Sequence, residues 1–68
     1  MGFSDELKRM RQRLGWSQDR MAREITIDPE FPVTIYKINR WESGKRPPNP
    51  YELIGLRWKL GEIEKERF

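Results

Sequence analysis

Arginine and lysine are the most numerous side chains in this sequence that could do chemistry, 14 against 11 aspartates and glutamates. They gather in two stretches: residues 8–23 carry six positive charges and one negative, and residues 33–46 carry four and one. Guanidinium and ammonium groups donate hydrogen bonds to phosphates and to the edges of nucleic-acid bases. Charged runs also cover ordinary solvated helices, so the charges alone leave both interpretations open.

The residues needed for most other site chemistry are absent. The sequence contains no cysteine and no histidine, which excludes disulfides, thiolate metal sites and imidazole bases. The carboxylates of Asp28 and Glu30 lie in a proline-bounded segment with no nucleophile or base beside them. We therefore expect neither an enzyme nor a bound metal or cofactor.

Length and composition predict one small domain spanning residues 1–68. A chain of 68 residues with 37% charged side chains and a net charge of +3 cannot be divided into two stable cores. Three tryptophans and three phenylalanines favour folding over disorder. The longest uncharged run, residues 31–36, is too short to cross a bilayer, and the first residues lack the apolar core of a signal peptide. We expect a cytoplasmic protein without membrane contact.

The basic stretches need helices to position them, and capping residues with apolar periodicity predict two in the first stretch. Ser4 is a candidate N-cap, and Gly15 ends the first helix. Only Gly15 and Trp16 separate it from a second helix capped by Ser17, which favours two helices packed at an angle. The expected core stripes are Leu7, Met10 and Leu14, followed by Met21, Ala22 and Ile25.

The second basic stretch allows two interpretations. The helical period is lost over residues 26–32, which predicts a loop, and residues 33–38 have the strand propensity to form a hairpin with residues 25–27. Thr34 can instead cap a helix that Gly44 ends, and we favour this helix. Its expected apolar positions are Ile38 and Trp41, and Glu42 beside them is expected to form either a structural ion pair, with Arg11 as partner, or a cap.

A further helix follows an extended basic linker at residues 45–48. Asn49, Pro50 and Glu52 match the N-cap, N1 and N3 positions of a capping box. The expected core stripe is Leu53, Leu56 and Leu60, with Ile54 and Trp58 beside it. Beyond Gly61, residues 62–68 form either another helical turn or a frayed tail. The pattern as a whole predicts an all-α fold, a compact bundle of four or five short helices.

Two strings of residues, read together, resemble the helix-turn-helix domains of the lambdoid repressor and Cro type, often called XRE-like. The first string is Leu7, Arg11, Leu14, Gly15, Trp16, Ser17, Gln18, Met21 and Ala22, and the second is Thr34, Ile38, Trp41, Glu42, Gly44, Lys45, Arg46 and Pro48. With the last helix, the resemblance covers about residues 4–60 and leaves 61–68 as a tail. It implies a helix-turn-helix domain. This sequence departs from the family pattern in the turn between helices two and three, which is longer by roughly six residues than the usual three to four.

The resemblance also implies a function and its residues. It implies a sequence-specific transcriptional regulator, a repressor that binds double-stranded DNA as a homodimer at a palindromic operator, with half-sites about 34 Å apart. The third helix of such domains lies in the major groove. The implied base contacts are Ile35, Tyr36, Lys37 and Arg40, and the implied phosphate contacts are Ser17, Gln18, Asn39, Lys45 and Arg46. The expected dimer contacts are the last helix and residues 62–68.

One alternative function remains open from the sequence. Small helix-turn-helix domains also act as antitoxin-like or co-regulatory modules, whose DNA binding depends on a protein partner. Ile63 and Phe68 would serve such a contact if they are exposed.

Overall fold

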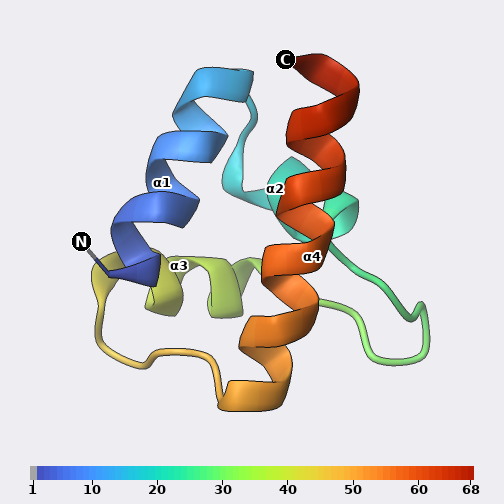
Figure 1. The fold of residues 1–68 in the computed structure, drawn as a ribbon. Helices are drawn as coiled ribbons and strands as arrows, with labels where there is room; N and C mark the ends of the chain where they lie inside the picture. Colours follow the sequence, from blue (N-terminus) through green and yellow to red (C-terminus); the bar gives the residue numbers. More distant parts are fainter. Residues whose placement is uncertain (1) are drawn as a thin grey trace.

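The computed structural model describes residues 2–68, which contain four α-helices (Figure 1). They are α1 (Phe3–Leu14), α2 (Gln18–Glu24), α3 (Ile35–Ser43) and α4 (Pro50–Arg67). In Figure 1, α1 and α4 stand beside each other, and α3 lies across their lower ends, where it packs against α1 and α2. No strand occurs in the described range, so the all-α prediction is confirmed and the hairpin is excluded.

Side-chain caps start three of the helices at the predicted residues. In each, the cap oxygen accepts a hydrogen bond from the backbone N–H three residues later. These bonds join Arg20 to Ser17 (3.1 Å), Lys37 to Thr34 (3.3 Å) and Glu52 to Asn49 (2.8 Å). The capping box is complete, because the backbone N–H of Asn49 donates to the Glu52 carboxylate at 3.0 Å. Local interactions therefore set the start of α2, α3 and α4.

The two glycines predicted to end helices do so in the left-handed backbone region. Gly15 follows α1 with φ 71°, and Gly44 follows α3 with φ 74°. Glycine adopts this conformation without a steric penalty. The chain changes direction sharply at both glycines, which separates α1 from α2 and α3 from the basic linker.

The predicted start of α1 is wrong. The N-cap is Gly2, which makes no side-chain cap bond, and Ser4 lies within the helix. The ring of Phe3 packs edge-on against Trp41, with centroids 6.3 Å apart and an interplanar angle of 76°. This contact between distant segments stabilises the first helical turn and outweighs the local preference of Ser4 for the cap.

α4 continues beyond Gly61 to Arg67, so residues 62–67 form further helix rather than a frayed tail. Ile63 falls on the same face as Leu56 and Leu60, and all three are buried. The hydrophobic core therefore extends past residue 60, the boundary expected from the sequence.

The buried residues form one cluster that all four helices and the α1–α2 turn share. Its members are Leu7, Trp16, Met21, Ala22, Ile25, Ile38, Trp41, Leu56, Leu60 and Ile63. Met10 and Leu14 pack partly buried against it, and Leu53 is half-buried. Trp16 was not predicted to be core; it lies under the guanidinium groups of Arg20 and Arg67, whose central carbons are 4.9 and 5.2 Å from its ring.

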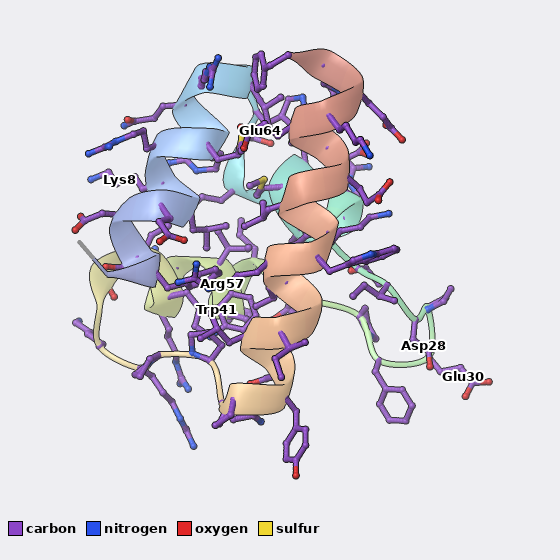
Figure 2. The ribbon with its side chains drawn as sticks, in the orientation of Figure 1. Lys8, Asp28, Glu30, Trp41, Arg57 and Glu64 are labelled. Atoms are coloured by element: carbon purple, nitrogen blue, oxygen red, sulfur yellow. The ribbon has the colours of Figure 1, made fainter. Side chains whose placement is uncertain are left out.

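The connection between α2 and α3 is an ordered loop closed by Thr26. Its hydroxyl donates to the carbonyl of Ala22 at 2.8 Å and accepts from the backbone N–H of Val33 at 3.0 Å. Asp28 and Glu30 lie at the tip of the loop and point away from the helices (Figure 2). These two hydrogen bonds join the two ends of the loop and so hold α2 close to the start of α3, while the tip of the loop protrudes.

None of the helices within residues 2–68 has the length and apolar composition that crossing a bilayer requires.

Candidate nucleic-acid interface

α3 has one face in the core and the opposite face in solvent. Ile38 and Trp41 anchor the inner face. On the opposite side of the helix, four exposed side chains form one face, which we call the α3 outer face: Tyr36, Asn39, Arg40 and Ser43. It presents phenol, amide, guanidinium and hydroxyl groups, and Tyr36 is 77% exposed. These groups can donate hydrogen bonds to an elongated polar ligand along the helix.

A two-pronged ion pair fixes the orientation of α3. Arg11 Nε donates to Glu42 Oε2 at 2.7 Å, and its Nη2 donates to Oε1 at 3.0 Å, as the sequence predicted. Arg11 Nη1 also donates to the carbonyl of Trp16 at 3.0 Å. The hydrogen bond to Glu42 raises the pKa of Arg11, and burial of the guanidinium opposes this rise. The pair locks α1, the α1–α2 turn and α3 into one rigid support for the outer face.

The start of α2 lies beside the same ion pair. The amide of Gln18 donates to Glu42 Oε1 at 3.4 Å, so this side chain is partly committed within the fold. Ser17 is exposed, but its hydroxyl already accepts the cap bond from Arg20. The structure thus brings Ser17 and Gln18 close to the end of α3 at Glu42, with Ser17 facing solvent.

Positive side chains line a hollow between α3 and the linker that follows it. Lys37, Arg40 and Arg46 line it together with Trp41, Pro47 and Glu52, and we call it the basic hollow. Lys37 Nζ lies 3.7 Å from Glu52 Oε2, so its charge is partly compensated. Arg40 and Arg46 form no salt bridge within residues 2–68 and remain available to an anion.

The remaining predicted contacts lie at the margins of this surface. Ile35 and Lys37 flank the outer face on opposite sides of α3, and Ile35 is 42% exposed. Lys45 is exposed in the linker next to Arg46. The structure therefore places Tyr36, Asn39 and Arg40 on one face, with the other predicted residues around it.

Sequence reasoning missed Ser43. It lies seven residues after Tyr36, a helical spacing that puts both on the same face, and its hydroxyl donates to the carbonyl of Arg40 at 3.0 Å. The cations of α2 are engaged on their own helix, Arg23 with Asp19 at 3.3 Å and Arg20 with Glu24 at 3.9 Å. Among the predicted contacts, the cations that remain for an anion therefore lie on α3 and the linker.

No protein-family model, no curated protein and no solved structure matches this chain. What this surface can bind is therefore inferred from its own side chains alone.

Proposed function

We propose that this chain is a sequence-specific DNA-binding transcriptional regulator of the cytoplasm, a repressor that binds a palindromic operator as a homodimer. The observation that carries the proposal is the α3 outer face. α3 is anchored from behind by Ile38, Trp41 and the Arg11–Glu42 pair, and it holds hydrogen-bond donors toward solvent. A helix presented in this way fits the major groove of B-DNA, which is about 12 Å wide.

The side chains of α3 suit contacts with base edges. The Arg40 guanidinium can donate both its hydrogen bonds to O6 and N7 of a guanine, and Lys37 can approach the same atoms from the flank. Ile35 suits the methyl group of thymine, and the Tyr36 phenol can serve as donor or acceptor. These residues would read the sequence, with Arg40 making the most specific contact.

Residues around the outer face suit the DNA backbone. Lys45 and Arg46 follow α3 and are exposed, Asn39 lies next to Arg40, and Ser17 and Gln18 lie at the start of α2. Contacts of these residues with phosphates would orient α3 in the groove and supply affinity that falls as salt rises.

The test is selection from a random duplex pool at near-physiological salt, with sequencing of the bound fraction. We expect enrichment of a palindrome whose half-site centres lie about 10 base pairs apart, or a multiple of this. A parallel selection with Arg57→Ala, an arginine of α4 that pairs with Glu6 of α1, controls for the loss of one charge and should enrich the same palindrome. Bulk binding without any enriched sequence would contradict the proposal.

A co-regulatory module that depends on a protein partner is the second candidate. It is favoured by the exposure of the large apolar side chains Phe31, Tyr51 and Trp58. Ile63 is buried and cannot make the contact considered from the sequence, whereas Phe68 is 54% exposed and meets that condition, with the Arg13 guanidinium 3.9 Å from its ring centroid. DNA binding that is weak for the pure chain and restored by a partner protein would identify this function.

A further inference from the structure

Apolar side chains occur on two faces of α4. Leu56, Leu60 and Ile63 are buried in the core. On the outer face, Tyr51, Ile54 and Trp58 follow one another at helical spacing and are 87%, 70% and 59% exposed. An apolar stripe along a helix normally packs against another surface. In the single chain, the outer face of α4 lacks such a cover.

The loop between α2 and α3 extends this apolar surface. Ile27 and Phe31 are both exposed, and with Tyr51 they line one hollow of about 340 Å³ beside α4. Ile27 reaches α4 because Gly55 has no side chain: a Cβ there would lie 3.2 Å from Ile27 Cδ1. We call the continuous surface of Ile27, Phe31, Tyr51, Ile54 and Trp58 the apolar patch.

The area of the apolar patch is that of a protein interface. Large apolar and aromatic side chains expose up to about 150–250 Å² each, so five at these exposures present on the order of 700 Å². The largest patch on a typical monomer is about 300–600 Å². A stable complex of standard size buries about 800 Å² on each partner. The patch is therefore large enough to be one half of such an interface.

We propose that the apolar patch seats a second copy of this chain in a two-fold symmetric dimer. A two-fold interface joins the same patch on both copies, which requires a surface that is compatible with itself. None of the five patch residues is charged, and the hollow that three of them line also holds Asp28, Lys37 and Glu52, so both signs of charge are available to pair across a two-fold axis. Both signs of charge occur around it, with Asp28 and Glu30 on the loop and Lys65 two turns after Trp58 on α4.

This dimer leaves the α3 outer face uncovered. None of the patch residues belongs to α3, yet the apolar hollow and the basic hollow share Lys37, Trp41 and Glu52. The two copies would therefore each carry a basic surface beside the dimer interface. The inference deepens the proposed function by assigning the contact surface of its homodimer.

The C-terminal residues are engaged elsewhere. The Arg13 guanidinium lies 3.9 Å from the ring centroid of Phe68, and Arg67 stacks on Trp16. Residues 67 and 68 thus pack against α1 and the α1–α2 turn of their own chain. The dimer contacts expected from the sequence are the last helix and residues 62–68; the patch keeps the last helix and replaces the tail by the loop between α2 and α3.

The test compares two matched phenylalanine variants of the full chain, Phe31→Ser in the patch and Phe68→Ser in the tail, by sedimentation equilibrium without DNA. We expect the wild type to form a dimer of twice 8.3 kDa. Phe31→Ser should raise the dimer dissociation constant about tenfold or more, as loss of a buried interface aromatic does, while Phe68→Ser leaves it nearly unchanged. Ile54→Lys on α4 provides a second disruptive variant.

The outcomes separate the possible occupants of the patch. Far-ultraviolet circular dichroism of each variant must match that of the wild type, which the exposure of Phe31 and Ile54 makes the expected result. A wild type that stays monomeric at every protein concentration measured would overturn the inference, and the patch would then be a contact for another protein. A dimer weakened by Phe68→Ser but unaffected by Phe31→Ser would assign the interface to the tail. Because no DNA is present, either failure is distinct from failure of DNA binding.

Discussion

Glu42 is the residue at which three helices meet. From α3 it accepts hydrogen bonds from Arg11 of α1 and Gln18 of α2, and its side chain is 6% exposed. Glu42→Gln keeps the shape but removes the charge that faces the Arg11 guanidinium. Breaking a fully buried pair costs about 3–5 kcal/mol; because Arg11 is partly exposed, we expect unfolding free energy to fall by about 2 kcal/mol. Urea denaturation followed by tryptophan fluorescence measures this loss.

The matched control is Glu6→Gln. Glu6 pairs with Arg57 at 3.3 Å, but the two side chains are 40% and 53% exposed, and such pairs contribute less than about 1 kcal/mol. If both variants lose the same stability, Glu42 does not hold the helices together as its geometry indicates.

Arg40 is the residue whose replacement tests base reading. Arg40→Ala should weaken binding to the selected operator by about 1–3 kcal/mol and relax the preference at one base pair, because one bidentate contact is lost. Fluorescence anisotropy against the operator and its single-base variants measures both effects. Arg57→Ala removes an arginine of α4 that is 53% exposed and pairs with Glu6 of α1, and it should change neither. Uniform weakening across all the duplexes would instead make Arg40 a phosphate contact.

At the scale of helices, the starts of α2, α3 and α4 could be predicted because their caps are local. Each depends on a side chain and an N–H three residues apart. The start of α1 could not, because it depends on Phe3 meeting Trp41 across the fold. The burial of Trp16 and Ile63 is likewise set by segments distant in sequence.

The candidate site, too, could be predicted from the sequence where it depends on one helix, and not where it joins distant segments. The α3 outer face follows from the helical period once Ile38 and Trp41 are assigned to the core. The ion pair of Lys37 with Glu52 joins different helices, so the sequence gives no spacing that reveals it. The apolar patch was hidden for the same reason, since Ile27 lies beside α4 only in the folded chain.

The glycines of α4 differ in what replacement by alanine should do. Glycine inside a helix costs about 1 kcal/mol relative to alanine. A Cβ at Gly61 would meet nothing within 4 Å, so Gly61→Ala should raise the free energy of unfolding by about 0.5–1 kcal/mol. At Gly55 a Cβ would lie 3.2 Å from Ile27 Cδ1, so Gly55→Ala should gain less. Urea titrations of the two variants rank them; a larger gain at Gly55 would show that Ile27 moves away freely.

For the whole molecule, the separation of charge predicts how DNA binding depends on salt. Arg40, Lys45 and Arg46 gather on α3 and the linker, whereas Asp28 and Glu30 occupy the protruding loop. Each phosphate neutralised by a cation contributes about 0.9 to the slope of log affinity against log salt. The linker cations should therefore account for a measurable part of that slope.

The double variant Lys45→Gln with Arg46→Gln tests this contribution. It removes two positive charges from each copy, so a dimer loses four contacts and the slope should become shallower by about 3–4. Lys8→Gln with Arg57→Gln, on α1 and α4, is the matched control, because both pairs lower the formal net charge from +3 to +1. Affinities measured over a salt series should give the control a slope within about 1 of the wild type. Equal changes of the salt slope in the two variants would mean that net charge alone drives binding. They would contradict the assignment of α3 and the linker as the DNA-binding surface.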